Sequence, residues 1–311
     1  MNAPVRLLLI ALVLVGALFT SFKFTPHHEG ETVFETLYFH VVPAKLVTDN
    51  HAPHDEQEYL MAASLPLPGL FDMDTHHEGT QLVFTNLQIF QIASVLLCLV
   101  CFFGLSSQIR SGNADPLGRF FIGWAMWIRD EMVYPNLGKE DGARFLPYFL
   151  TLFFFIVFMN LMGLLPWSAT PTASIAVTCA LAVITFGSML IVGMRTQGVV
   201  GYFKNLVPHV PAALWPLMFV VELVGLLVKP FALMIRLFAN MTGGHMVVLS
   251  FLGLIFFFGQ ENPTAGYGAS PVAIGFAVFI MIIESFVALL QAYIFTLLSI
   301  LFLGSSLHPE H

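Results

Sequence analysis

Long apolar runs alternate with short polar segments along most of the chain after residue 80. A helix that crosses a bilayer needs about 20 apolar residues. Five segments reach that length, at residues 82–105, 145–165, 173–194, 217–241 and 271–303. The apolar pattern therefore predicts an all-α polytopic membrane protein that crosses the bilayer with about five helices.

The last two apolar segments are expected to form a pair. The run from Leu217 resumes as residues 246–258 after two glycines, and residues 259–270 then supply a polar turn. We expect the final helix to start at Pro271, because proline is favoured in the first turn of a helix. The prolines between residues 204 and 216 exclude a regular helix there. Residues 201–305 are therefore expected to form a long helical hairpin.

The first residues combine a short cationic start with a 13-residue apolar run, from Leu7 to Phe19. That run is short for a membrane span and is typical of a signal peptide. Residues 1–22 are therefore either a cleaved signal or a retained short anchor. Both alternatives place the segment that follows on the external side of the membrane.

Residues 120–134 mix aromatic and charged side chains. Trp124 and Trp127 lie close in sequence to Arg129, Asp130 and Glu131. This mixture predicts an amphipathic helix that lies in the membrane interface. The alternative is a loop with scattered aromatic residues.

Composition supports the membrane assignment. Hydrophobic residues make up 57% of the chain and charged residues only 10%, whereas soluble domains average about 25% charged residues. The net charge of −7 argues against a nucleic-acid partner. The three cysteines, Cys98, Cys101 and Cys179, lie inside apolar runs, which supports neither a disulfide framework nor a zinc site. We expect no cofactor and no metal.

The distribution of charges predicts the orientation. Residues 20–80 contain ten acids and only two lysines, whereas residues 108–144 contain five Lys and Arg residues. The positive-inside rule places the second segment in the cytoplasm and the first outside. The resulting division is 1–22 as signal or anchor, 23–80 as an external acidic and His-rich segment, 81–108 as the first membrane helix, 109–144 as a cytoplasmic loop with the amphipathic helix, 145–200 as the second and third membrane helices, 201–305 as the hairpin and 306–311 as a cytoplasmic tail.

One short motif occurs twice in the external segment. His-His-Glu-Gly stands at residues 27–30 and again at residues 76–79. His-rich segments can bind metal ions, but no third ligand at a fixed spacing is apparent. We therefore favour a solvated loop over a metal site.

Several charged and polar residues stand where the chain should be apolar. Such residues are costly in a bilayer and usually mark ion pathways. Glu222, Lys229 and Arg236 are spaced seven apart, close to two helical turns, so they share one stripe. Asn240 lies one turn further on the same side. Glu284 and Gln291, also seven apart on the last helix, form a second stripe. The two stripes can meet across the hairpin, and His245 follows the first.

Each of these residues also has a purely structural interpretation. Lys229 can extend its side chain to the interface, and Glu222 can simply be its neighbour. Asn240 and Gln291 can join the two helices by a hydrogen bond, and His245 can be an ordinary core histidine. Arg236 lies about 20 residues into its apolar stretch, too deep to reach the interface easily, and its structural alternative is an ion pair with Glu284.

The chemistry of Arg236 suggests a mechanism. A guanidinium group stays protonated in proteins and cannot relay a proton, whereas Glu222, His245 and Glu284 can exchange protons. Two titratable regions separated by a permanent cation pass no protons by themselves. They conduct only if a partner carries protons past the block on its own carboxyl group, which Arg236 would deprotonate by stabilising the anion.

Three motifs resemble subunit a of the F-type ATP synthases, the membrane stator of a proton-driven rotor. They are KPFALMIRLFANMTGGH from Lys229 to His245, ESFVALLQAYIFTLLSILFL from Glu284 to Leu303, and NLMGLLP from Asn160 to Pro166. The resemblance covers roughly residues 82–305. It implies a bacterial inner-membrane protein whose two long helices are tilted nearly into the membrane plane.

The resemblance also implies roles for individual residues. Arg236 corresponds to the essential arginine that faces the carboxylate of the rotor ring. Asn240, His245, Glu284 and Gln291 correspond to positions that line the half-channel from the outside. Glu222 corresponds to an acidic position in the cytoplasmic half-channel. The His and Glu positions are exchanged relative to enterobacterial members, and Met234 stands where the family usually has a small residue.

The implied partners are the c-ring, the b subunits of the peripheral stalk and the lipid bilayer, with coupling of proton flow to ATP synthesis. No GxxxxGK[ST] loop is present, so ATP chemistry would belong to other subunits and this subunit would be non-catalytic. One alternative is a secondary ion-coupled transporter, which the absence of an inverted repeat disfavours. Another is an intramembrane protease, which the absence of GxSxG and HExxH motifs argues against.

Overall fold

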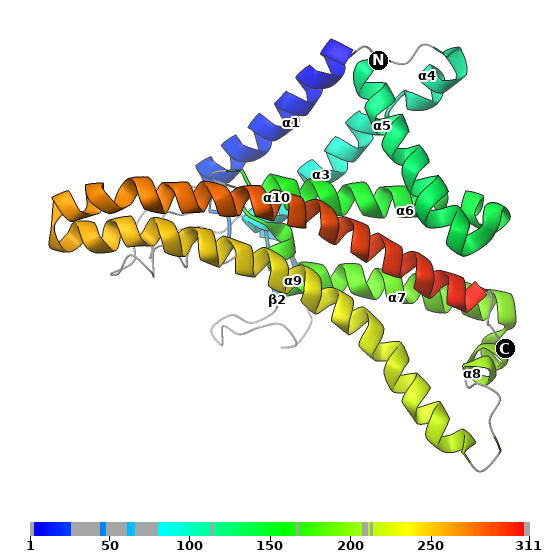
Figure 1. Ribbon diagram of the computed structural model, residues 1–311. Coiled ribbons are helices and arrows are strands. Elements are labelled where there is room, and N and C mark those ends of the chain that lie inside the picture. Colours follow the sequence, from blue (N-terminus) through cyan, green and yellow to red (C-terminus); the bar gives the residue numbers. More distant parts are fainter. Residues whose placement is uncertain are drawn as a thin grey trace.

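The computed structural model describes residues 3–25, 44–47, 61–65, 80–112, 115–165, 168–206, 211 and 214–307. Nearly all of these residues are helical (Figure 1). The α-helices are α1 (Ala3–Phe24), α3 (Asn86–Phe102), α4 (Leu105–Ser111), α5 (Pro116–Trp127), α6 (Tyr134–Gly163), α7 (Ile175–Gln197), α8 (Val199–Asn205), α9 (Trp215–Glu261) and α10 (Pro263–Leu307). A π-helix, η1 (Ile128–Val133), joins α5 to α6, and a 3-10 turn, η2 (Pro171–Ala173), precedes α7.

Five helical stretches in the described residues are long and apolar enough to cross a membrane. They are Ala3–Phe24, Pro116–Gly163, Ile175–Gln197, Trp215–Gln260 and Pro263–Leu307. Helix α3 is apolar too but has only 17 residues. The prediction of an all-α polytopic membrane protein is confirmed.

Helices α9 and α10 form the long hairpin expected from the sequence. They lie side by side near its turn and diverge toward the other end, where α7 contacts both (Figure 1). They contain 47 and 45 residues, so each is about 70 Å long at 1.5 Å per residue. The hydrocarbon core of a bilayer is only about 30 Å thick. Both helices are therefore much longer than an upright span requires, which fits the expectation that they are tilted.

The turn of the hairpin is shorter than the sequence suggested. The expected polar turn over residues 259–270 is wrong, because α9 continues to Glu261 and α10 begins at Pro263. Asn262 ends the first helix and caps the second, where its Oδ1 atom accepts a hydrogen bond from the Thr264 backbone N–H at 3.1 Å. Pro271, expected as the start of the final helix, lies inside α10.

Helix α1 is longer than the apolar run that indicated it. It extends through the flanking residues to 22 residues and packs along α3. Ala17 of α1 joins Phe90 and Leu97 of α3 in one buried apolar cluster. At its other end, the fully buried Arg6 side chain lies 3.2 Å from Oδ1 of Asp115, which caps α5.

Residues 120–134 are helical, as predicted for an amphipathic helix, and the loop interpretation is wrong. Their position in the membrane interface stays a prediction. The helix continues into α6, with a kink at Gly138 where φ is 74°, so α6 begins well before the expected residue 145. The ring of Trp127 lies 5.8 Å from that of Tyr293 on α10, which links this segment to the hairpin.

Two short strands were not anticipated from the sequence. β1 (Met61–Leu65) and β2 (Thr80–Val83) form an antiparallel ribbon just before α3. The two His-His-Glu-Gly segments, residues 27–30 and 76–79, lie outside the described residues.

Candidate functional site

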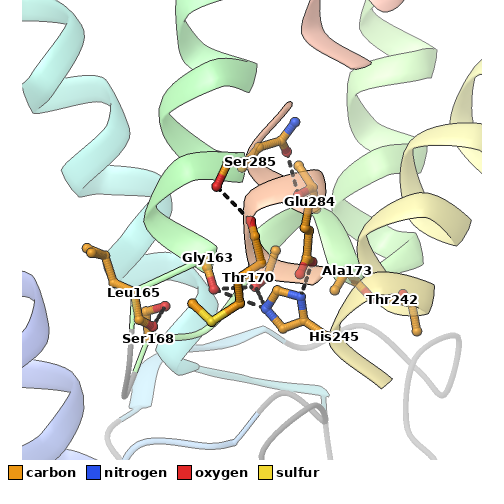
Figure 2. A network of polar contacts seen from close by, with 12 residues as sticks. Gly163, Leu165, Ser168, Thr170, Ala173, Thr242, His245, Glu284 and Ser285 are labelled. Carbon is orange, nitrogen blue, oxygen red and sulfur yellow. Dashed lines mark hydrogen bonds and ion pairs between the residues drawn. The ribbon is translucent and has the colours of Figure 1, made fainter. Parts of the chain in front are cut away.

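His245 and Glu284 join the two helices of the hairpin. Nδ1 of His245, on α9, lies 2.7 Å from Oε1 of Glu284 on α10. The two side chains are 20% and 5% exposed, so the pair is largely shielded by the surrounding helices. Figure 2 shows the imidazole ring directed toward the carboxylate.

The other edge of the imidazole faces the end of α6. Its Nε2 atom lies 2.7 Å from Oγ1 of Thr170 and 3.0 Å from the Gly163 carbonyl oxygen. The Thr170 hydroxyl also lies 3.3 Å from that carbonyl and can donate to it. Both ring nitrogens of His245 therefore have polar partners, and they come from three different elements (Figure 2).

Asn160 of α6 connects the segment before α7 to the helix that carries Glu284. The Thr172 hydroxyl donates to Oδ1 of Asn160 at 2.7 Å, and Nδ2 of Asn160 donates to the Ala288 carbonyl at 3.1 Å. All three residues are buried, and Ala288 lies one helical turn after Glu284. This connection fixes α10 relative to α6 beside the His245–Glu284 pair.

Asn240 and Gln291 form a second contact between α9 and α10, and here the two stripes meet as expected. Nδ2 of Asn240 donates to Oε1 of Gln291 at 2.8 Å. Gln291 is only 2% exposed, and its Nε2 atom has no hydrogen-bond partner among the residues that the structure describes. An unpaired buried donor is costly, so this position favours a water molecule or another polar partner.

Arg236 stands apart from these contacts. Its side chain is exposed and makes no hydrogen bond or ion pair with the residues that the structure describes. Arg236 does not form the ion pair with Glu284 that the structural interpretation expected, because Glu284 contacts His245 instead. The neighbouring apolar positions on α9, Ala232, Ile235 and Ala239, are exposed as well.

Glu222 and Lys229 lie at a separate polar region. Both line a cavity of about 640 Å³ whose wall includes Tyr202 and Asn205 of α8 and Ser305 near the end of α10. The Lys229 ammonium also lies 5.5 Å from the centre of the Phe302 ring. Neither His245 nor Glu284 lines this cavity. Along α9, Arg236 therefore falls between two polar regions.

Sequence reasoning missed three residues that shape the site. Thr170 and Gly163 contact His245 from 75 and 82 positions away, and no local pattern signals such a distant contact. Gly244 was read as an interruption, but α9 is continuous there. A side chain at Gly244 would place its Cβ 2.6 Å from Oε1 of Glu284, so glycine provides room for that carboxylate.

The described residues include no group of three or more His, Cys, Asp or Glu side chains that could hold a metal ion. They contain a titratable pair, an amide pair, an exposed cation and a separate cavity lined by Glu222 and Lys229. This arrangement can take up and release protons at two places on either side of a fixed positive charge.

Comparison with known proteins agrees with this chemistry. Residues 88–304 match the family described as "ATP synthase A chain". The chain is 48% identical to "ATP synthase subunit a" of Myxococcus xanthus over 186 residues, 60% of this chain and 59% of that protein. It is 43% identical to the protein of the same name from Chloroherpeton thalassium over 225 residues, 71% of this chain and 65% of that protein. The aligned part thus spans less than two thirds of either relative.

Proposed function

The chain belongs to the ATP synthase A chain family, and on that premise we propose that it is the proton-translocating stator subunit a of an F-type ATP synthase. In this role it provides two offset half-channels to a rotor ring and couples proton flow to rotation and ATP synthesis. Membership of this family disfavours the alternative of a secondary ion-coupled transporter.

The observation that carries the proposal is the environment of Arg236. An exposed cation within an apolar helix, with no partner among the described residues, is costly in a bilayer unless another protein supplies an anion. A carboxyl group on a neighbouring helical ring would supply that anion. The uncovered apolar surface around Arg236 would supply the packing.

The two polar regions support two separate half-channels. His245, Glu284, Asn240 and Gln291 would form the half-channel from the outside, and Glu222 would lie in the cytoplasmic half-channel. Glu222 and Arg236 are 14 positions apart, about 21 Å along a straight helix. A proton therefore has no direct step between the regions within this chain and would cross on the rotor carboxyl group.

The proposed assembly follows from the same role. The c-ring would pack on the exposed face of α9, and the b subunits of a peripheral stalk would hold the chain stationary. ATP chemistry would take place on other subunits. The proposed membrane is the bacterial inner membrane, with residues 23–80 outside and the C-terminus in the cytoplasm, as the distribution of Lys and Arg suggests.

The test is ATP-driven proton pumping in membrane vesicles. We expect Arg236→Ala to abolish pumping while the complex still assembles, because the variant loses the charge that deprotonates the rotor. Arg195→Ala is the matched control, since Arg195 is an exposed arginine at the end of α7, and it should pump normally. Full pumping by Arg236→Ala would refute the proposal.

A further inference from the structure

We propose that Thr170 and the Gly163 carbonyl keep a proton on Nε2 of His245, so that the ring exchanges protons through Nδ1 alone, with Glu284. Thr170 would then be a positioning residue that selects the protonation state of the histidine. The consequence for translocation rests on the proposed function, whereas the position of the proton on the ring does not.

The Nε2 side of the ring faces groups that need a donor. Gly163 ends α6, and the last four carbonyls of a helix have no intrahelical partner. Its oxygen lies 3.0 Å from Nε2, and a carbonyl oxygen can only accept. An unprotonated Nε2 would place two lone pairs against each other at that distance. A proton on Nε2 satisfies the carbonyl instead.

Thr170 strengthens this preference through the direction of its hydroxyl group. The hydroxyl can donate to the Gly163 carbonyl at 3.3 Å, which turns an oxygen lone pair toward Nε2 at 2.7 Å. The Nε2–H group then donates to both oxygens. Thr170 is 6% exposed, so no bulk water competes for these positions.

The Nδ1 side is the place where the charge state can change. Nδ1 and Oε1 of Glu284 are 2.7 Å apart, so one proton lies between them. With Nε2 already protonated, the pair is either an imidazolium with a carboxylate or a neutral imidazole with a carboxylic acid. Both states keep the hydrogen bond. Removing that shared proton would leave two lone pairs in contact.

This asymmetry restricts the route of a proton. A histidine that passes protons through its ring must release one nitrogen while it takes up a proton at the other. If Nε2 loses its proton, the single Thr170 hydroxyl proton can serve either Nε2 or the Gly163 carbonyl but not both, so one of these two acceptors is left without a donor. Protons that use this pair would therefore enter and leave by way of the Glu284 carboxyl group, with His245 as its fixed partner.

The fold keeps Thr170 in place by close packing. A Cβ atom on Gly163 would lie 2.8 Å from Cβ of Thr170, so only glycine allows this approach. The next residues form the η2 turn, and the Thr172 hydroxyl holds that turn to Asn160 at 2.7 Å. The hydroxyl group of Thr170 is thus held at a fixed position relative to the imidazole ring.

The direct test is nitrogen NMR of the protein in lipid bilayers with ¹⁵N-labelled histidine rings. The His245 signals are assigned by their loss in His245→Asn. We expect Nε2 to stay protonated across the titration while only Nδ1 changes. An Nε2 that lacks a proton in the neutral ring would overturn the proposal, whether or not the protein pumps.

Variants at Thr170 separate positioning from packing. Thr170→Val removes the hydroxyl but keeps the shape, and losing one hydrogen bond of about 1 kcal/mol should shift the ratio of ring tautomers toward Nδ1–H by about fivefold. Thr170→Ser should restore the wild-type signals. The control is Thr178→Val, because the Thr178 hydroxyl bonds only within the first turn of α7, and it should leave the His245 signals unchanged.

The same variants give a transport readout. Thr170→Val should slow ATP-driven pumping several-fold and Thr170→Ser should restore it. Wild-type NMR signals in Thr170→Val would refute the role of Thr170. If the NMR results hold but Arg236→Ala pumps normally, the proposed function fails and the protonation state of His245 stands.

Discussion

The carboxylate of Glu284 occupies space that exists because residue 244 has no side chain. A Cβ on Gly244 would lie 2.6 Å from Oε1 and 2.7 Å from Cδ of Glu284, closer than such atoms approach in folded proteins. The neighbouring Gly243 has no atom within 4 Å of the same position. Two adjacent glycines on α9 therefore meet opposite surroundings.

This difference predicts opposite effects of one substitution. Gly244→Ala should displace Glu284 and cost about 1–3 kcal/mol, as overpacking usually does, with slower proton pumping. Gly243→Ala should raise stability by about 0.5–1 kcal/mol, because alanine favours a helix over glycine. Thermal unfolding of both purified variants in detergent measures the effects. Equal midpoints would contradict the packing described here.

An exchange of the titratable pair tests whether His245 and Glu284 act together. Each single change, His245→Glu or Glu284→His, places two groups of the same kind side by side. The double variant restores one of each and should pump better than either single variant. It should still fall below the wild type, because a carboxylate at residue 245 cannot donate to the Gly163 carbonyl. Pumping no better than in the worse single variant would count against a coupled pair.

The contact between Arg6 and Asp115 predicts that α1 is a permanent part of the folded protein. Arg6 is fully buried and also donates to the Phe103 carbonyl at 3.2 Å. Arg6→Met would leave the Asp115 carboxylate without its cation and should cost about 3–5 kcal/mol. Adding Asp115→Asn should recover most of that loss, since the amide oxygen can still cap α5. Unfolding measurements on both variants decide this, and an unchanged stability of Arg6→Met would favour a dispensable leader over an anchor.

The orientation of the chain can be measured by cysteine labelling. Cys98, Cys101 and Cys179 are first replaced, so that a single new thiol reports. Thr75→Cys should react with an impermeant reagent in cells with a permeabilised outer membrane, because Thr75 belongs to the acidic segment 23–80 that the distribution of Lys and Arg predicts to be external. Lys139→Cys should react only once the inner membrane is opened. The reverse pattern would invert the topology.

Much of the fold follows from hydropathy, because the bilayer demands long apolar helices. The same rule could not locate the turn at Asn262. Residues 259–270 contain polar and glycine residues, yet α9 and α10 pack closely enough there for helix to continue almost to the tip. A Cβ on Gly266 would lie 2.7 Å from Cα of Gly259, and that contact depends on tertiary structure.

The site, like the fold, could be predicted from the sequence only in part. Seven-residue spacing identified Glu284 and Gln291 as one stripe, and the hairpin brought them to His245 and Asn240. The partners Gly163, at the end of α6, and Thr170, in the connection to α7, carry no periodic signal in the sequence that points to His245. Charge alone could not show that Glu284 contacts His245 and leaves Arg236 exposed.

The central claim is that Arg236 separates two half-channels and that protons cross only on a rotor carboxyl group. The most direct measurement is passive proton flux into liposomes under an imposed potential, for the purified chain alone and for the chain with its ring. The chain alone should be nearly impermeable to protons, because a fixed guanidinium repels H⁺ and cannot pass it on, and adding the ring should open the path. Equally high flux in both preparations would mean that the proton path is continuous within this chain and would contradict the two half-channels.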